Sequence, residues 1–446
     1  MIYKLYSMRS FGIIDIGTIA TTVFCCMDSP QPHWANSILC SAKTDIGLRR
    51  ANNQDSHAVI LAGSHSSWKE RGHLLIVADG MGAHAAGEVA SQTSTDTIAM
   101  SYSKRTKEFP PLALQDAVYD AHQRIREQSA KDDAFRDMGT TVDALLLLPQ
   151  GAVIAHVGDS RVYRWRNQTI EQLTFDHSLV WEVCVAFKLP FDQPPADIPR
   201  NQITRSLGPT DKLKVDLEGP YPIEVGDVFL VCSDGLSGQI NDREIGQLLG
   251  VLSPEEATET LVNIANLRGG PDNITLIVAK ATETEDQHLP QSPGIPGSAW
   301  ISLAVTAVMF LVMALGFFLS ESHFAAWLGG TGVVFGLTAF VWCMRDSLFS
   351  SAYRYPSPDE SYGNGPYTSY HCPPSMVFTE KLASILQQFR HVTQGSQWDI
   401  PWDKADLREQ AALAAIRSKN YGAAIREYCL TINLLMYELK KQKPKK

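Results

Sequence analysis

The sequence lacks the signatures of several common protein classes. Its eight cysteines are scattered and form no C-x-x-C pair, which argues against structural zinc and for a reducing compartment. No G-x-x-x-x-G-K-[ST] loop is present, which argues against a nucleotide triphosphatase. No basic stripe is present and the net charge is −9, so the chain is not expected to bind nucleic acid.

Two long runs are instead free of charge, at Ser298–Ser320 and Phe324–Met344. Each has about 20 residues or more, enough to cross a bilayer as a helix. Only Glu321–His323 separates them, so they are expected to form an antiparallel hairpin with both flanks on one side. Arg345 and Arg354 follow the second run, and this bias predicts cytoplasmic flanks. The alternative is a buried hairpin of a soluble domain, although such helices normally keep a polar face.

The 446 residues allow two or three domains. We divide them into a lead without an assigned structure (1–36), an α/β region (37–281), a Pro-containing acidic linker (282–297), the hairpin (298–344), a disordered linker (345–375) and a helical region (376–446). Within the last, Ala412–Ile432 resembles one tetratricopeptide-like helix pair. Such a pair either docks a protein partner or packs privately against Met376–Val392. The basic tail Lys440–Lys446 is interpreted as a solvated end, with contact to anionic lipid as the alternative.

Strand-like and helix-like patterns alternate between residues 37 and 281. Buried strands are predicted at 74–79, 142–148, 152–157, 228–234 and 274–280, and helices after Gly87 and over 112–128 and 254–267. Pro149–Ala152 joins two of the strands as a hairpin turn. That hairpin favours antiparallel pairing over a pure βαβ sheet.

Four acidic turns are the most informative feature. They are NNQD at Asn52–Asp55, VADGMGAH at Val77–His84, VCSDG at Val231–Gly235 and GGPDN at Gly269–Asn273. In the last three, an Asp stands at or near the end of a strand-like run, where a turn begins. One fold can bring these aspartates into a single carboxylate cluster, and carboxylate ligands suit hard divalent cations such as Mg²⁺ or Mn²⁺.

Seven blocks of the sequence, in order, resemble motifs of the metal-dependent serine/threonine protein phosphatases of type 2C, in the form found in bacterial members. They are TDIGLRRANNQD (44–55), VADGMGAHAAGE (77–88), MGTT (138–141), AHVGDSRVY (155–163), ITRSLG (203–208), VCSDGLS (231–237) and GGPDNIT (269–275). The blocks are spread over a stretch of about 240 residues. A single Asp-Gly pair would usually be a turn, but the ordered set is specific.

The resemblance implies an α+β fold, a β-sandwich of two antiparallel sheets flanked by helices, with two Mn²⁺ or Mg²⁺ ions at one edge. The implied roles are Asp55 as the bridge between both metals, Asp79 and the Gly80 carbonyl on one metal, Asp234 and Asp272 on the other, Asp159 with Asp234 on a third, weaker metal, and Arg50 as the phosphate-binding residue. Arg50 and Asp55 are thus the expected catalytic residues. Two metals can ionise a water and neutralise developing charge, while a guanidinium orients the phosphate.

The chain departs from the family pattern at two positions, Gln54 and Met81. Many members have Glu where Gln54 stands, touching a metal through water, and eukaryotic members have a general-acid His where Met81 stands. His84 is a candidate substitute or a packing residue, and a metal-bound water is the other proton source. Asn273 and Thr140 are expected to support the site through backbone contacts. The alternative for Asp159 is that it pairs with Arg161 or is a turn residue and binds no metal. Arg49, the neighbour of Arg50, is the other candidate for the phosphate-binding role.

The resemblance therefore predicts a membrane-tethered phosphatase acting on protein substrates of a serine/threonine kinase. No cysteine is followed six residues later by Arg, which excludes the thiolate phosphatase motif. The alternative is a catalytically weak member that serves as a membrane signalling scaffold, for which Gln54 and Met81 are the only support. A transporter is disfavoured because the two apolar runs carry no charge.

Overall fold

The computed structural model describes residues 38–82, 85–191, 194–199, 201–282, 361–393 and 398–442, all of which belong to one compact unit. The predicted lead and the predicted membrane hairpin lie outside these residues. Among the helices of the described part, none is both long and apolar enough to cross a bilayer.

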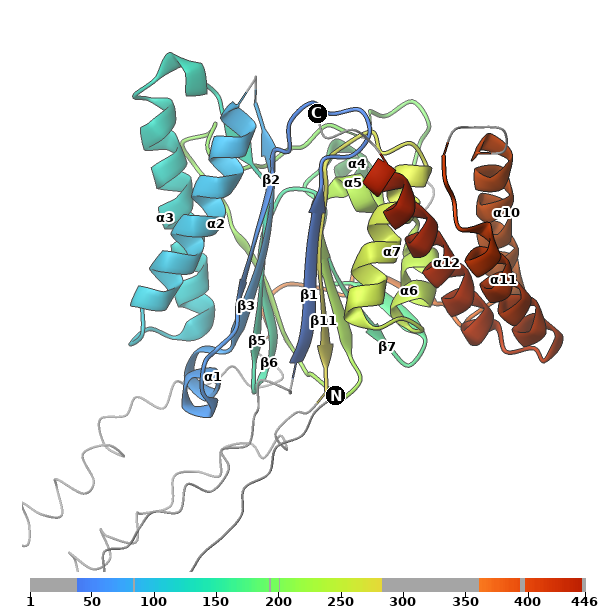
Figure 1. Cartoon of the computed structure of the whole chain (residues 1–446). Coiled ribbons are helices and arrows are strands. Elements are labelled where there is room, and N and C mark those ends of the chain that lie inside the picture. Colours follow the sequence, from blue (N-terminus) through green and yellow to red (C-terminus); the bar gives the residue numbers. More distant parts are fainter. Residues whose placement is uncertain are drawn as a thin grey trace, which may run out of the picture. The chain divides into compact units, whose positions relative to one another are not determined.

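Two antiparallel sheets face each other in a sandwich (Figure 1). The first has the order β1 (Ile38–Asp45), β11 (Ile274–Ala281), β10 (Val228–Cys232), β7 (Arg161–Arg166), β8 (Thr169–Gln172) and β12 (Thr368–His371). The second has the order β2 (Asp55–Ile60), β3 (His73–Met81), β5 (Val142–Leu148), β6 (Gly151–Val157) and β9 (Asp216–Tyr221), with β4 (Gly139–Thr140) on β3. The predicted antiparallel sandwich is confirmed.

The central strands are apolar at nearly every position because both of their faces are covered. In β10, Val228, Leu230 and Cys232 join the core under the helices, while Phe229 and Val231 fill the space between the sheets. Successive side chains of a strand point to opposite faces, so a continuous apolar run is what a doubly covered strand requires. The predicted turn at Pro149–Ala152 does connect β5 to β6.

Helices cover both outer faces of the sandwich. The long helices α2 (Ala86–Lys104) and α3 (Pro110–Ser129) pack on the second sheet, and α6 (Asp242–Leu249) and α7 (Pro254–Leu267) on the first (Figure 1). Three short elements are α1 (His65–Arg71), α5 (Asp234–Ser237) and the 3₁₀ turn η2 (Asp133–Phe135). Helix α7 begins with a capping box between Ser253 and Glu256 and has Pro at its first turn, which fixes its start.

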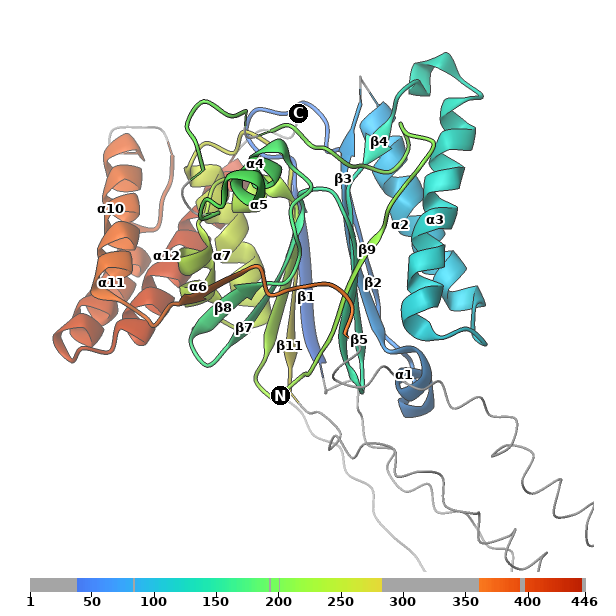
Figure 2. The ribbon, with the colours of Figure 1, turned by 180° about the vertical axis from the view of Figure 1, so that it is seen from behind.

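Residues 361–375, here called the strap, do not fit the sequence-based expectation. We predicted disorder over 345–375, and this is wrong for the described part of that range. Strand β12 extends the first sheet by pairing with β8, and Tyr362 bridges Gly219 beside β9 of the second sheet. The strap therefore runs along the open edge of the sandwich (Figure 2). The segment has few aliphatic residues, but backbone hydrogen bonds to β8 replace the apolar contacts that order most strands.

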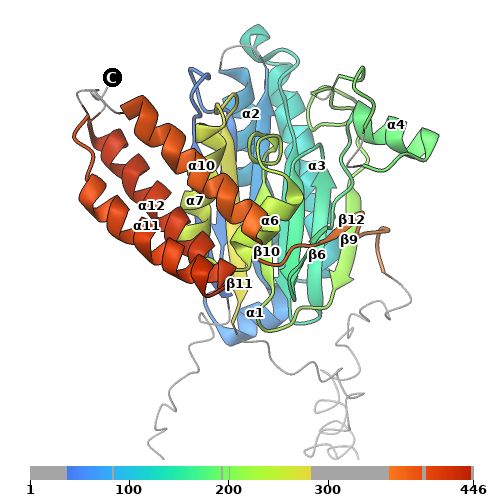
Figure 3. The same cartoon turned by 90° about the vertical axis from the view of Figure 1, so that its right-hand side faces the viewer.

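Three helices follow the strap, α10 (Met376–Thr393), α11 (Trp402–Arg417) and α12 (Tyr421–Gln442), and we call them the C-terminal bundle. They lie together beside α7 (Figure 3). A short turn joins the last two helices, with Lys419 in a left-handed conformation. Ile425, Tyr428 and Ile432 of α12 join the core of the first sheet and its helices. The helix pair thus packs on α10 and on the helices of the first sheet, as expected for the alternative in which it forms a bundle within the chain.

Candidate active site

The aspartates singled out from the sequence gather at one end of the sandwich. Asp55 begins β2 and faces Asp79, its register partner near the end of β3. Asp234 begins α5 directly after β10, and Asp272 lies in the loop that enters β11. Asp159 lies in the loop between β6 and β7. Since all these strands start or finish at this end, antiparallel pairing brings residues far apart in sequence into one cluster.

The first sheet orients Asp55, the carboxylate predicted to bridge two metals. The Ser233 hydroxyl donates to Asp55 Oδ2 at 2.8 Å, while the Thr275 amide donates to Ser233 Oγ at 3.0 Å. Asp55 Oδ1 is buried and has no hydrogen-bond partner among the described residues. One oxygen is therefore fixed by the protein while the other is left for a ligand.

Arg50 reaches the same cluster from the loop that precedes β2. Its guanidinium donates to Asp272 Oδ2 at 2.7 Å, with 48 % of the arginine side chain exposed. This places Arg50 at the site, whereas Arg49 makes no hydrogen bond to the carboxylates. The exposed fraction leaves the guanidinium accessible to an anion in front of the cluster.

Asp159 does not pair with Arg161, which was one of the alternatives. The Arg161 guanidinium instead binds Asp176, with Nη2 to Oδ2 at 2.7 Å, and approaches Asp242 at 3.6 Å. Asp159 Oδ1 and Asp234 Oδ1 are both buried without a partner among the described residues. These two carboxylates line one pocket together, and their sharing of an ion stays a prediction.

The cluster is electrostatically unfavourable by itself. Burial raises the pKa of Asp55 to about 7, and repulsion from Asp234 and Asp272 adds to that rise. Burial likewise raises the pKa of Asp159 to about 8, with a further contribution from Asp234. For Asp79 burial and the neighbouring carboxylates raise the pKa well above its ordinary value. Each carboxylate destabilises the charge on its neighbours, which bound cations would relieve.

The donor set fits a pair of hard divalent cations. Asp55, Asp159 and Asp234 each keep a buried, unpartnered carboxylate oxygen, and carboxylate oxygen is the ligand such ions prefer. Within the described residues, no three acidic, His or Cys side chains already stand in ligating geometry. Burial and repulsion from Asp272 also raise the pKa of Asp234 above its ordinary value. Bound cations would offset this repulsion.

Polar side chains and tight backbone contacts support the loops of the site. Asn273 accepts from the Gln54 amide at 2.8 Å and donates to the carbonyls of Ile46 and Asn52 at 2.9 and 3.0 Å. A Cβ on Gly80 would stand 2.1 Å from the Gly87 carbonyl oxygen, so only glycine fits there. Asn273 therefore has the supporting role expected, and Gly80 marks a close approach of β3 to α2.

A model of the family described as protein phosphatase 2C matches residues 48–265. A putative protein phosphatase 2C-type from Streptococcus pyogenes is 36 % identical over 252 residues, covering 55 % of this chain and 98 % of that protein. Protein phosphatase PhpP of Streptococcus pneumoniae is 35 % identical over 262 residues, with the same coverage. The chain belongs to the protein phosphatase 2C family. Among solved structures, the serine/threonine phosphatase of S. agalactiae is 33 % identical, covers 55 % of this chain and 100 % of its own, and has a TM-score of 0.49.

Membership of the protein phosphatase 2C family confirms the expected enzyme class, a metal-dependent protein serine/threonine phosphatase, and the expected Mn²⁺ or Mg²⁺ cofactors. The strap and the C-terminal bundle lie beyond the residues that the family model matches. They are additions of this chain to the phosphatase 2C domain.

Both residues at which this chain departs from the family pattern, Gln54 and Met81, are described, whereas the candidate proton donor His84 is not. The Gln54 side chain donates to the Gly82 carbonyl at 3.3 Å, and its backbone carbonyl accepts from the Gly80 amide at 3.1 Å. Met81 ends β3 opposite Gly139. His84 lies outside the described residues, so its role stays a prediction.

Sequence reasoning missed several supporting side chains of this phosphatase domain. Ser233 lies in the family-like block at residues 231–237, but nothing in the sequence distinguished its hydroxyl as the partner of Asp55. The Thr141 hydroxyl accepts from the Asp79 amide at 2.9 Å and shares a hydrogen bond with Ser160 at 2.8 Å. Asp176, the partner of Arg161, carried no local signal because the pair joins the start of β7 to the segment after β8. Thr140 has its expected supporting role, donating to the Asp79 carbonyl at 2.9 Å.

Proposed function

We propose that this phosphatase hydrolyses phosphoserine and phosphothreonine in protein substrates of a serine/threonine kinase, with a water activated by two divalent cations. The observation that carries the proposal is the set of converging carboxylates at the end of the sandwich, several of which keep buried, unpartnered oxygens. When bound, two such cations would lower the pKa of a water and neutralise charge that develops on the phosphoryl group.

The residues that would hold the cations follow from their positions. Asp55 faces Asp79 on one side and is held by Ser233 of the other sheet, so it suits the bridging role. Asp79 and the Gly80 carbonyl would serve one cation, and Asp234 and Asp272 the other. Asp159, which lines a pocket with Asp234, would help to hold a third and weaker ion.

Arg50 would bind the phosphate of the substrate. Its guanidinium now donates to Asp272 and is about half exposed, so it can turn from that carboxylate to an anion without crossing the protein core. The flat guanidinium can donate two parallel hydrogen bonds to a phosphate, which fixes the orientation of the phosphoryl group. His84 or a solvent molecule would supply the proton to the leaving hydroxyl.

We further propose that residues 298–344 tether the enzyme to a membrane as a two-span hairpin, with the phosphatase domain and the C-terminus in the cytoplasm. The packing of the flanking regions supports this topology. Chain segments before and after the hairpin share one hydrophobic core, in which Leu261 and Val262 of α7 join Ile432 and Leu435 of α12. Two regions that pack together must lie on the same side of a bilayer, which an even number of spans satisfies.

The second candidate function is a catalytically weak scaffold at the membrane. Gln54 favours it, because an amide at this position lacks the charge that would help to attract a cation. The C-terminal bundle would then dock a protein partner through its outer face, where Leu407 is 70 % exposed.

The test is phosphate release from a phosphothreonine peptide by the full chain in detergent, with Mn²⁺ and then with EDTA. The full chain is needed because a truncation at residue 281 would remove β12 and the bundle from the core. Turnover should require Mn²⁺ and fall by at least about 10²-fold in Asp234→Asn. Asp403→Asn, an exposed aspartate at the start of α11, is the matched control and should retain turnover. A folded, Mn²⁺-loaded chain without turnover would favour the scaffold.

A further inference from the structure

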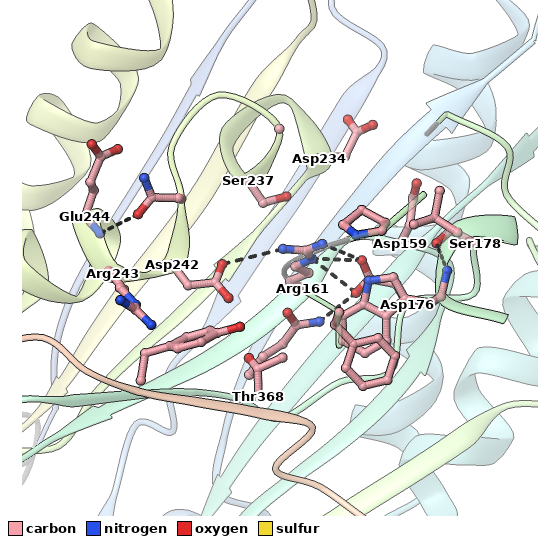
Figure 4. A pocket seen from close by; sticks show the side chains of 18 of the residues that line it. Asp159, Arg161, Asp176, Ser178, Asp234, Ser237, Asp242, Arg243, Glu244 and Thr368 are labelled. Atoms are coloured by element: carbon pink, nitrogen blue, oxygen red, sulfur yellow. Dashed lines mark hydrogen bonds and ion pairs between the residues drawn. The ribbon is translucent and has the colours of Figure 1, made fainter. Parts of the chain in front are cut away.

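A pocket of about 850 Å³ joins the phosphatase domain to the chain's C-terminal additions (Figure 4). Its walls come from the β6–β7 loop, the residues around α4 (Leu179–Phe187), the segment from α5 to α6, the strap and the start of α10. This volume lies in the range of sites that enclose much of a bound ligand. The strap and α10 contribute Thr368, Tyr370, Ser375, Val377, Phe378 and Lys381.

The inner end of the pocket reaches the candidate active site. Asp159 and Asp234, two of the carboxylates with unpartnered oxygens, belong to its lining. A phosphorylated residue held at the carboxylate cluster would therefore have neighbouring residues of its own chain next to this pocket. The occupant best suited to the pocket is thus the polypeptide that flanks the phosphorylated residue.

The floor of the pocket offers polar groups without partners. Gln172 of β8 and Thr368 of β12 stand opposite each other in the strand register, and both line the pocket. Gln172 is 1 % exposed, and its Nε2 donates to the Thr174 carbonyl and to Asp176, which fixes the amide's orientation. Gln172 Oε1 and Thr368 Oγ1 have no partner among the described residues. An acceptor beside a hydroxyl suits the N–H and C=O groups of an extended peptide.

The outer end of the pocket carries one available positive charge. Arg161 is saturated by Asp176 and lies near Asp242, and Lys381 pairs with Glu244 at 3.0 Å. Arg243 instead lies over the Tyr370 ring, 5.0 Å from its centre, and no ion pair joins it to another described residue. The stacking on a strap residue orients its guanidinium at the edge of the pocket. A carboxylate on the bound peptide would complete this arrangement.

We propose that this pocket is a substrate groove, built partly by the strap, that binds the polypeptide flanking the phosphorylated residue and selects an acidic side chain through Arg243. The proposal rests on the phosphatase function above. It makes Arg243 a specificity-determining residue and Thr368 a residue that binds the peptide backbone, and it gives the strap a direct part in substrate binding.

The test compares two phosphothreonine peptides of equal length, one with Glu and one with Lys on both flanks, using the full chain with Mn²⁺. The wild type should prefer the acidic peptide in kcat/KM by about threefold, the effect expected of one exposed ion pair. Arg243→Glu should reverse the preference, because the new carboxylate repels Glu and attracts Lys. Thr368→Val should raise KM for both peptides about equally, since it removes a contact to the peptide backbone.

The matched control is Arg124→Glu, which makes the same charge change on the exposed face of α3, and its peptide preference should equal that of the wild type. If Arg243→Glu lowers turnover of both peptides equally, or leaves the preference as it was, the substrate groove is wrong. Turnover of p-nitrophenyl phosphate by the wild type separates the two proposals. Its absence would reject the phosphatase function, whereas its presence with an unchanged peptide preference would reject the groove alone.

Discussion

The carboxylates of this protein occur in two opposite environments, at the catalytic end of the sandwich and at the interface with the C-terminal bundle. In the cluster, burial and neighbouring carboxylates raise the pKa of Asp55 to about 7. At the interface, burial alone would raise the pKa of Glu244, but hydrogen bonds and charge attraction from Arg268 and Lys381 outweigh it and hold that pKa below its ordinary value.

This difference distinguishes carboxylates that stabilise the fold from carboxylates that serve the active site. Glu244 has cations on both oxygens, with Arg268 at 2.7 Å and Lys381 at 3.0 Å, so its charge is balanced within the chain. Asp55 and Asp159 have buried oxygens with no partner among the described residues, so their charge is balanced only by something that binds. Such unbalanced, partly buried groups are typical of functional sites.

The largest expected effect comes from removing one charge of the cluster. Asp55→Asn should lower Mn²⁺-dependent turnover by at least about 10²-fold, because the predicted bridging ligand is lost. The same change should stabilise the metal-free chain, since it relieves repulsion while the amide oxygen can still accept from Ser233. A rise of about 1–2 °C in Tm would correspond to about 1 kcal/mol for a chain of this size.

Thermal unfolding in EDTA and in Mn²⁺ provides the measurement for Asp55→Asn. Mn²⁺ should raise the Tm of the wild type, because a ligand that binds only the folded state stabilises it. The increase should shrink in Asp55→Asn and persist in Asp403→Asn. A lower Tm of Asp55→Asn in EDTA would mean that the cluster is stabilising by itself, and the contrast with the interface would fail.

The cluster was largely predictable from the sequence because each aspartate stands beside local turn chemistry. Asp79 and Asp234 precede glycines at strand ends, and an antiparallel fold brings such ends together. The supporting Ser233 and Thr141 hydroxyls were not predictable, since their partners lie far away in sequence. The strap escaped prediction for a related reason. Its β12 is ordered by backbone pairing with β8. Backbone hydrogen bonds form with any side chains, so they produce no periodic pattern of apolar residues in the sequence.

The second prediction uses pH to separate the two environments. Asp55 has a raised folded pKa of about 7, so in EDTA its contribution to stability should fall as the pH rises from about 4 to about 7. Glu244 has a lowered folded pKa, so its contribution is present above its unfolded pKa and is lost as the pH falls through the folded value. The metal-free chain should therefore be most stable near pH 5.

Denaturant unfolding from pH 4 to pH 8 checks this profile. The loss of stability between pH 5 and pH 7 should be on the order of 2 kcal/mol in EDTA and should be smaller in Asp55→Asn. Mn²⁺ should reverse the trend, because deprotonated carboxylates bind the cation better. If stability in EDTA instead rose steadily up to pH 7, the carboxylates of the cluster would not share protons in the folded chain.

The smallest expected effect belongs to a single ion pair at the interface. Arg426 of α12 pairs with Glu256 of α7, and half of the arginine side chain is exposed, so solvent weakens the attraction. Hydrogen bonding to Arg426 nevertheless lowers the pKa of Glu256. Arg426→Ala should cost at most about 1 kcal/mol in the free energy of unfolding, with an unchanged dependence on urea.

A double-mutant cycle isolates this pair. Glu256→Gln is the suitable partner change because glutamine can still accept from the Ser253 amide, which keeps the capping box of α7. The coupling between Arg426→Ala and Glu256→Gln should be about 0.5 kcal/mol. Arg124→Ala, which breaks an exposed pair with Glu127 on α3, is the control and should show no coupling to Glu256→Gln. A coupling of zero for Arg426 would mean that this exposed pair does not help to hold the bundle on the phosphatase domain, and that the balanced charges of the interface act only where they are more deeply buried, as at Glu244.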